Sequence, residues 1–213
     1  MSPYYDNRFE KEITFATGNP MTIDTTQYFP PGIIATTSDE VFVDGGGFIG
    51  DTVINFVEQT KGAFNKIYVF EPISGIYQQA VKNTAHLKDK IVLYNAGLYS
   101  EHTKTVFEDN GSGSRAARAG KEIVTLVKFD EHLPEAERSQ VTYIKLDIEG
   151  SEMKALEGMK ETIATFKPKL AICIYHRPAD LWEIPLYIHR LNPDYKLYIR
   201  QHHHIFETVF YAI

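Results

Sequence analysis

The sequence lacks cysteine pairs, long apolar runs and a secretory leader. Cys173 is the single cysteine among 213 residues, so no internal disulfide can form and nothing in the composition requires an oxidising compartment. No apolar run approaches the roughly 18 residues that a membrane span needs. The first residues carry neither a basic nor an apolar segment of the kind that directs secretion. We therefore expect a cytoplasmic protein without a membrane span.

The sequence also lacks a surplus of positive charge. Its formal net charge is −6, its pI is about 5.8, and no run of Lys or Arg stands out. Binding to nucleic acid depends on clustered basic side chains that neutralise phosphates, so no nucleic-acid partner is expected. Hydrophobic residues make up 43% of the chain. That content and the chain length suit one well-buried core rather than two domains.

Short apolar runs alternate with segments of helical periodicity along most of the chain. Seven strands are predicted, at 41–43, 67–70, 91–94, 143–148, 169–175, 195–200 and 208–212, and helices at 50–60, 74–87, 129–139, 150–165 and 181–191. The alternation predicts an α/β fold with a doubly wound, mostly parallel seven-stranded sheet covered on both faces. The last two strands are joined by a short connection, which predicts a C-terminal antiparallel hairpin.

Two segments fall outside this alternation. Residues 1–37 form a polar lead-in with weak strand character, which we separate as a cap segment from a main domain over residues 38–213. Tyr28 and Phe29, near its end, are candidates to cover the pocket of a cofactor. Residues 103–129 contain two further strand-like runs around the Gly/Ser-rich stretch 111–115, which is typical of a mobile loop.

The sharpest motif is Asp44-Gly45-Gly46-Gly47-Phe48-Ile49-Gly50, between the first strand and the first helix. Glycines at such a turn let the backbone approach a ligand closely, and the N–H groups at a helix start suit an anion. The motif satisfies both G-x-G-x-x-G, typical of dinucleotide-binding proteins, and D-x-G-x-x-x-G, typical of methyltransferases. An acid at the strand end fits poorly beside a pyrophosphate and well beside an ammonium group, which favours the second pattern.

Further acids follow at the ends of later strands. Glu71 lies 21 residues after Gly50, a spacing that suits a carboxylate accepting hydrogen bonds from two ribose hydroxyls. Asp147 and Glu149 end the fourth strand and project to one side if the strand persists that far. Glu152 is expected in the first turn of the next helix, as a solvated or capping acid that complements the helix dipole.

These motifs occur together and in order. The set consists of residues 43–52, Phe70-Glu71-Pro72, residues 144–152 and a β-rich ending with Tyr198-Ile199-Arg200, His202 and residues 208–212. It resembles the FkbM-type methyltransferase family over roughly residues 38–213. The resemblance implies a Rossmann-like class I methyltransferase fold, S-adenosylmethionine as cofactor, and O-methylation of a sugar, glycan or small-metabolite hydroxyl. One departure is Gly47-Phe48, where the family pattern has a small residue followed by a polar one.

The resemblance also implies roles for individual residues. Asp44, Gly46 and Gly50 would hold the methionine part of the cofactor, and Asp147 would stand beside the transferred methyl group. The ribose would lie on Glu71, and the adenine near Asn95 and Ala96. The complete set of expected cofactor-binding residues is Asp44, Gly45, Gly46, Gly50, Thr52, Glu71, Pro72, Asn95 and Ala96.

A hydroxyl is a poor nucleophile until its proton is removed, so a base or a metal ion is needed. Asp147 could be the base, or could ligate Mg²⁺ together with Glu149. His176, just after the fifth strand, is the better base at neutral pH, because an unperturbed His has a pKa near 6.5 and an Asp one near 3.9. The candidate catalytic residues are thus Asp147, His176 and Glu149, and no resident structural metal is expected.

Two other functions use the same motifs. An NAD(P)-dependent oxidoreductase would bind its cofactor on the glycine loop, but no Tyr-x-x-x-Lys follows the fourth strand on a helix. A non-catalytic binding module would keep the glycine loop and lose support for Asp147 and His176. The expected partner is a small-molecule or glycan hydroxyl, and a homodimer is compatible with the sequence.

Overall fold

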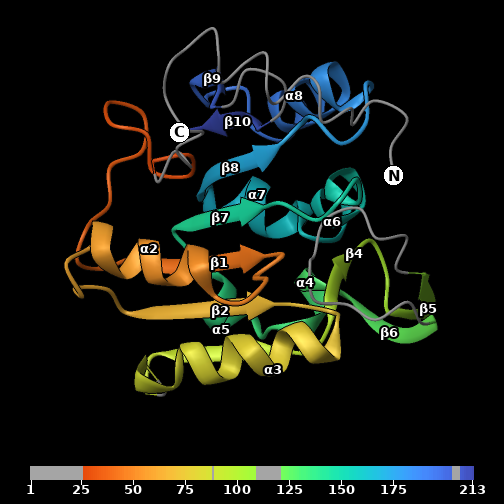
Figure 1. Ribbon diagram of the computed structural model, residues 1–213. Coiled ribbons are helices and arrows are strands. Elements are labelled where there is room, and N and C mark those ends of the chain that lie inside the picture. The colour runs from red at the N-terminus through yellow and green to blue at the C-terminus, as the bar shows by residue number, and fades with distance from the viewer. Residues whose placement is uncertain (1–25, 88, 109–120, 203–206) are drawn as a thin grey trace, which may run out of the picture.

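A seven-stranded sheet runs through the whole molecule (Figure 1). The computed structural model describes residues 26–87, 89–108, 121–202 and 207–213. The sheet has the strand order β3-β2-β1-β7-β8-β10-β9. The strands are β1 (Val41–Gly45), β2 (Lys66–Phe70), β3 (Ile91–Tyr94), β7 (Tyr143–Leu146), β8 (Lys169–Cys173), β9 (Leu197–Gln201) and β10 (Thr208–Ala212).

The pairing of the strands confirms the predicted fold class. The pairs β1–β2, β2–β3, β1–β7 and β7–β8 are parallel, whereas β10 runs antiparallel to both β8 and β9. The hairpin β9–β10 is the predicted C-terminal one. The chain winds outward from β1 to β3 and then returns to β7, so the winding reverses between β1 and β7. In an open α/β sheet the ligand crevice lies at this point, beyond the carboxyl ends of the strands.

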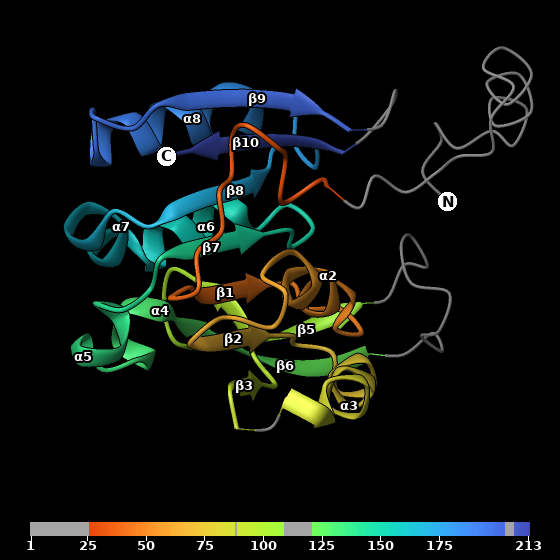
Figure 2. The ribbon, with the colours of Figure 1, turned by 90° about the vertical axis from the view of Figure 1, so that its left-hand side faces the viewer.

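Helices cover both faces of the sheet (Figure 2). The longer ones are α2 (Asp51–Gln59), α3 (Ser74–Asn83), α6 (Glu152–Gly158), α7 (Lys160–Phe166) and α8 (Asp180–Leu191); the short ones are α4 (Phe129–His132), α5 (Glu135–Arg138) and the 3₁₀ turn η1 (Ala85–Leu87). Apolar side chains of α6, α7 and α8 share one core with one sheet face, and α2 packs into a second core on the other. Within the described ranges, no helix combines the length and apolarity needed to cross a membrane.

The segment before β1 belongs to the second core. In Figure 2 it crosses in front of several strands of the sheet on its way to β1. Tyr28 and Phe29 are buried. The Phe29 ring lies 5.8 Å from that of Tyr143 and 6.0 Å from that of Phe56, between centroids. Aromatic pairs at such separations stabilise a core beyond the area they bury.

A second, smaller sheet flanks the first. It has the order β4-β6-β5, with β4 (Gly97–Tyr99), β5 (Thr103–Glu108) and β6 (Lys121–Lys128). The two strand-like runs predicted within 103–129 are therefore confirmed as β5 and β6. The mobile loop predicted around 111–115 lies outside the described residues.

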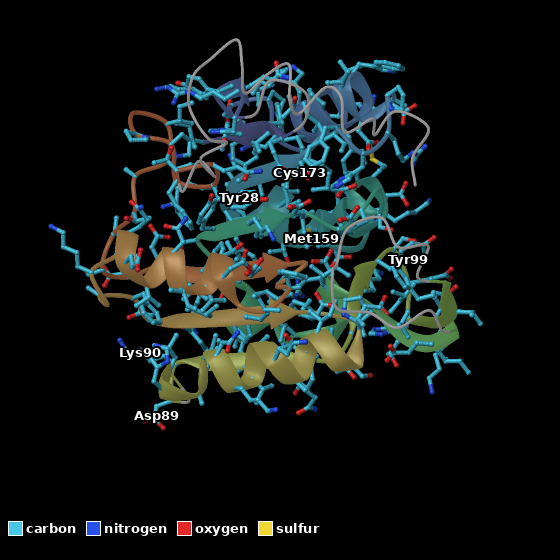
Figure 3. The ribbon with its side chains drawn as sticks, in the orientation of Figure 1. Tyr28, Asp89, Lys90, Tyr99, Met159 and Cys173 are labelled. Atoms are coloured by element: carbon cyan, nitrogen blue, oxygen red, sulfur yellow. The ribbon has the colours of Figure 1, made fainter. Side chains whose placement is uncertain are left out.

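Two predicted helices are each divided. The helix predicted over 150–165 breaks at Met159 into α6 and α7. Figure 3 shows Met159 where α6 meets β4, which carries Tyr99. A Cβ on Gly158 would stand 1.9 Å from the Tyr99 carbonyl oxygen, so this close packing requires glycine. The helix predicted over 129–139 breaks before Pro134, because the residue before a proline disfavours the helical region.

Helix α3 begins at Ser74, the first residue of the helix predicted over 74–87. Ile73 is its N-cap residue, and no side chain caps the helix. The Ser74 N–H donates to Glu122 Oε1 at 3.1 Å. An acid from β6, 48 residues further along the chain, replaces the local cap.

Candidate functional site

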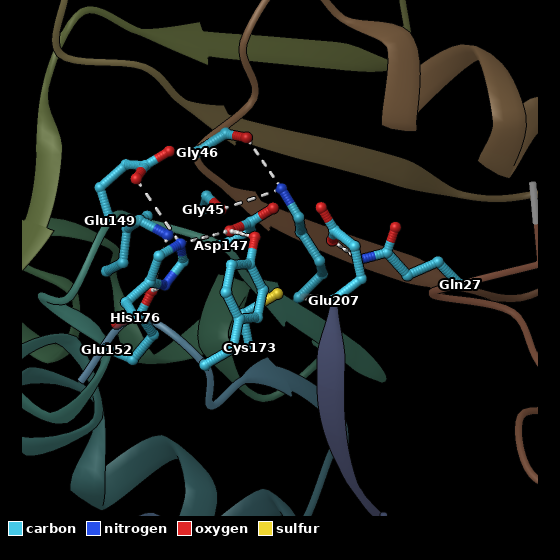
Figure 4. Close-up of polar contacts among 12 residues, drawn as sticks. Gln27, Gly45, Gly46, Asp147, Glu149, Glu152, Cys173, His176 and Glu207 are labelled. Carbon is cyan, nitrogen blue, oxygen red and sulfur yellow. Dashed lines mark hydrogen bonds and ion pairs between the residues drawn. The ribbon is translucent and has the colours of Figure 1, made fainter. Parts of the chain in front are cut away.

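The candidate site lies where the loops after β1, β2, β7 and β8 meet, at the point where the winding reverses. Figure 4 shows residues at the ends of β1, β7 and β8 and just beyond them, together with Gln27 from the segment before β1 and Glu207 directly before β10. The site has two parts. One is the glycine loop with Asp44, Lys145 and Glu71, and the other is a group of acids around His176.

The glycine loop is packed so tightly that side chains are excluded at its centre. Gly46 has φ +78°, and a Cβ there would stand 1.9 Å from the Asp147 carbonyl oxygen. A Cβ on Gly47 would stand 2.1 Å from Val69 Cγ1. The N–H groups of Gly46 and Gly47 donate to the Phe70 carbonyl at 3.0 and 3.2 Å, so the loop folds over the end of β2.

The start of α2 completes this loop. Gly50 is the N-cap residue of α2 with φ +88°. Thr52, in the first turn, is buried. Phe48, the departure from the family pattern, is also left-handed, with φ +43°. Phe48 is 38% exposed, so its side chain lies at the surface, while its backbone N–H donates to Glu71 Oε2.

Beneath the loop lies a buried ion pair that the sequence analysis did not assign. Lys145 Nζ donates to Asp44 Oδ1 at 2.9 Å and to the Gly46 and Gly45 carbonyls at 2.8 and 3.2 Å. Asp44 and Lys145 are register partners on β1 and β7 and are almost fully buried. Burial raises the pKa of Asp44 to about 6, even though Lys145 opposes the shift.

The second oxygen of Asp44 is left without a partner. Asp44 Oδ2 is buried and accepts no hydrogen bond from the described residues. A Cβ on Gly47 would lie 3.9 Å from this oxygen, so the oxygen faces the glycine loop. A buried carboxylate oxygen without a donor is costly. The position therefore suits a ligand that brings a donor group to the loop.

Glu71 lies on the other side of the loop and turns inward. It is 6% exposed, and its two oxygens accept the N–H groups of Phe48 at 3.1 Å and Ile73 at 2.9 Å. Burial raises the pKa of Glu71 to about 7, against the lowering effect of these hydrogen bonds. Asn95 Nδ2 donates to the carbonyls of Glu71 and Pro72, both at 3.0 Å, and so fixes the end of β2. Ala96 is buried directly beyond it.

The acid group centres on His176, which follows β8. His176 Nε2 lies 3.5 Å from Asp147 Oδ1 and 3.6 Å from Glu149 Oε2. On the other side of the ring, Nδ1 lies 2.9 Å from Glu152 Oε1. The structure therefore brings together all three predicted catalytic residues. Strand β7 ends at Leu146 and Glu149 is left-handed, with φ +56°, so the loop rather than strand alternation turns Glu149 toward the ring.

Glu152 lies where it was predicted but differs in its exposure to solvent. The residue does lie in the first turn of α6, but it is fully buried rather than solvated. Its Oε1 also accepts the Ile148 N–H at 2.9 Å. The imidazole of His176 provides the positive partner that a buried carboxylate needs.

Tyr28 links the segment before β1 to this group. Its hydroxyl donates to Asp147 Oδ2 at 2.7 Å, and Lys145 Nζ lies 5.1 Å from its ring centroid. Burial alone would raise the pKa of Asp147, but Lys145, the Tyr28 hydroxyl and His176 together lower it below its usual value. Asp147 therefore stays ionised at neutral pH. Tyr28, a candidate to cover the cofactor pocket, thus lies against Asp147, the residue expected beside the transferred methyl group.

Arg200 and His202 belong to the β-rich ending that resembles the family. His202 Nε2 lies 2.5 Å from the Tyr211 hydroxyl, and Arg200 is exposed on β9.

Comparison with known proteins agrees with this geometry. Residues 44–209 match the Methyltransferase FkbM domain. The chain belongs to the FkbM methyltransferase family. The match begins at Asp44 and includes both the glycine loop and the acid group. It decides against the oxidoreductase interpretation of the glycine loop. No curated protein sequence matches the chain.

Solved structures extend the comparison. The chain is 28% identical to methyltransferase FkbM from Methylobacillus flagellatus KT, with a TM-score of 0.75; the match covers 89% of this chain and 47% of that one. It thus spans about half the length of this relative. Sp1610 of Streptococcus pneumoniae in complex with S-adenosyl-L-methionine is 18% identical, with a TM-score of 0.51 over 89% of this chain and 69% of that one. At that identity the likeness shows the fold alone.

Proposed function

We propose that this FkbM methyltransferase uses S-adenosylmethionine to methylate a hydroxyl group of a sugar, glycan or small metabolite in the cytoplasm. The observation that carries the proposal is the unpartnered Asp44 Oδ2 under the glycine loop. The methionine part of the cofactor carries an ammonium group, which supplies the donor that this oxygen needs. Its carboxylate would lie at the N–H groups of the glycine loop and of the start of α2, which favour an anion.

The remaining cofactor contacts follow from the end of β2. Each Glu71 oxygen already accepts one backbone N–H and keeps a second lone pair for a ribose hydroxyl. Asn95 holds the backbone of Glu71 and Pro72 at the edge where the adenine would lie, beside Ala96. Bound S-adenosylmethionine supplies an electrophilic methyl group on a positively charged sulfur.

The acid group is suited to preparing the acceptor. Burial disfavours the charged form of His176, but Glu152, Asp147 and Glu149 outweigh this effect and raise its pKa. Nε2 of the neutral ring can take the proton of an acceptor hydroxyl. The acceptor oxygen forms a bond to the methyl carbon, the carbon–sulfur bond breaks with its electron pair remaining on sulfur, and the proton passes to Nε2. Asp147, kept ionised, favours the imidazolium that results.

The negative charges around His176 also indicate which acceptor can bind and whether a metal ion takes part. Three carboxylates surround one imidazole, so an anionic acceptor would be repelled and a neutral hydroxyl favoured. Asp147 and Glu149 both lie against Nε2. We propose the imidazole, and not Mg²⁺ held by these two acids, as the group that receives the proton.

Calorimetric titration with S-adenosylhomocysteine and with NADH tests the cofactor. We expect S-adenosylhomocysteine to bind and NADH not to bind, and Asp44→Asn and Glu71→Gln to weaken binding. Tight binding of NADH alone contradicts the proposal. Transfer of labelled methyl from S-adenosylmethionine to a panel of neutral sugars, with and without EDTA, tests the reaction. Binding without transfer to any neutral hydroxyl of the panel would favour the non-catalytic module instead.

A further inference from the structure

Glu152 and His176 form the tightest contact in the acid group. Their Nδ1–Oε1 distance is 2.9 Å, whereas the contacts on Nε2 are 3.5 and 3.6 Å. Glu152 Oε1 does not lie along the direction of the Nδ1–H bond. The contact is therefore an ion pair and not an aligned hydrogen bond. Glu152 is fully buried, while 70% of the Glu149 side chain is exposed. The contact of Nδ1 with Glu152 is therefore short and buried, whereas the contacts of Nε2 with Asp147 and Glu149 are longer and more exposed to solvent.

The distances favour one nitrogen as the site of the proton. A neutral imidazole has one N–H and one lone pair, and either nitrogen can hold the proton. A bare lone pair at Nδ1 would face a carboxylate oxygen at 2.9 Å, and two electron-rich atoms repel each other at that separation. An N–H at Nδ1 turns the same contact into an attraction. The carboxylates beside Nε2 lie farther away, at 3.5 and 3.6 Å, so the shorter contact favours the proton on Nδ1.

Glu152 itself is held in place from two directions. Its Oε1 accepts the Ile148 N–H at 2.9 Å, so the loop after β7 fixes the carboxylate, and helix α6 fixes its backbone. Glu152 Oε2 is buried and has no partner among the described residues. The imidazole edge, 2.9 Å from Glu152 Oε1, can offset this buried charge.

We infer that Glu152 is a positioning residue that keeps the proton of neutral His176 on Nδ1, so that Nε2 is the nitrogen free to accept the proton of the methyl acceptor. The inference rests on the proposed function. It gives Glu152 a role that the family match and the predicted catalytic set do not include. Glu152 acts through His176 and does not itself contact the acceptor.

The other charged groups near His176 do not replace Glu152. Asp147 and Glu149, on the loop after β7, lie against Nε2. Asp180, at the start of α8, interacts with Arg177 and, over a longer range, with the His176 ring. Glu207 adds negative charge near Glu149. Of these groups, Glu152 alone makes a short contact with Nδ1.

Nitrogen-15 NMR of the full chain tests the inference directly. The His176 signals are assigned by their loss in His176→Asn. We expect the neutral ring to be the Nδ1–H tautomer and to titrate above the usual histidine value. Glu152→Gln keeps the shape and removes the charge, so the pKa of His176 should fall and the tautomer preference should weaken. Glu149→Gln, the matched loss of charge on the other nitrogen, should lower the pKa and leave the tautomer unchanged.

The methyl-transfer assay gives a second readout with the sugar acceptor that the panel identifies. Glu152→Gln should lower kcat by on the order of 10²-fold, the usual effect of losing general-base assistance. It should also move the acid limb of the kcat–pH profile to lower pH, which a merely structural defect would not do. Glu157→Gln, on the same helix and paired with Lys154 at 2.8 Å on the surface, should leave both unchanged.

The outcomes separate this inference from the proposed function. An Nε2–H tautomer in the wild-type protein overturns the inference, and this measurement needs no variant to fold. A folded Glu152→Gln variant also overturns the inference if the pKa and the tautomer of its His176 equal those of the wild type. The NMR experiment uses no acceptor, so failure of methyl transfer would leave its result standing. Conversely, a negative NMR result would leave S-adenosylhomocysteine binding intact.

Discussion

Replacing Lys145 by Met tests whether the buried ion pair supports both the fold and the cofactor site. Lys145 Nζ makes three contacts, to Asp44 Oδ1 and to two carbonyls of the glycine loop. The variant fills a similar space but leaves Asp44 buried without a positive partner. Removing one member of a buried pair costs about 3–5 kcal/mol. At about 2–4 °C per kcal/mol for a chain of this size, Tm should fall by about 6–20 °C.

Urea denaturation followed by circular dichroism measures the loss, and two further variants calibrate it. Lys66→Met breaks a pair with Glu137 in which both side chains are 39% exposed, so it should cost no more than about 1 kcal/mol. The double variant Asp44→Asn/Lys145→Met removes both charges and should recover most of the stability, without recovering cofactor binding. A Lys145→Met protein within about 1 kcal/mol of the wild type would refute the reasoning, as would a double variant no more stable than the single one.

Three further changes address the site. Gly46→Ala places a methyl group 1.9 Å from the Asp147 carbonyl at φ +78°, so it should abolish S-adenosylhomocysteine binding by calorimetry while circular dichroism reports a lower Tm. The pKa values of Asp44 and Glu71 are about 6 and about 7, and the donor groups of the ligand favour the ionised carboxylates. The affinity for S-adenosylhomocysteine should therefore be low at acid pH and rise to a plateau above neutrality. An affinity that does not change across this pH range contradicts these assignments. Tyr28→Phe removes the hydroxyl that donates to Asp147. It should lower the free energy of unfolding, measured by denaturation, by about 1.5–3 kcal/mol, and it should raise the pKa of Asp147. An unchanged pKa of Asp147 would contradict this role of Tyr28.

The sequence was sufficient to predict the sheet and the glycine loop, because both are local patterns. Buried parallel strands appear as short apolar runs, and Asp44 to Gly50 is a continuous motif. The positions of Asp147 and His176 followed from the rule that strand ends meet at one edge. Glu71 was predicted in the same way, from its distance to Gly50.

The ion pair and the inner acid could not be predicted with the same rules. Lys145 stands in the buried strand Tyr143-Ile144-Lys145-Leu146, and a lysine in such a run is buried only when it is paired. That signal was present, but the partner lies 101 residues away on β1, and local periodicity says nothing about it. The position of Glu152 predicts a solvated or capping acid, because the first turn of a helix favours an acid that complements the helix dipole. Its burial beside His176 depends on the segment after β8, which local periodicity does not reveal.

The contact between Tyr28 and Asp147 has a consequence for how the protein is produced and divided. A version shortened to residues 38–213 would retain every strand of the seven-stranded sheet, yet it would open one side of the group of acids around His176 to water. The Asp147 oxygen would exchange a tyrosine donor for solvent, and the space left by Phe29 between Phe56 and Tyr143 would cost about 3–5 kcal/mol. Expression boundaries and fusion junctions should therefore lie upstream of residue 26, so that this aromatic pair stays attached to the catalytic fold.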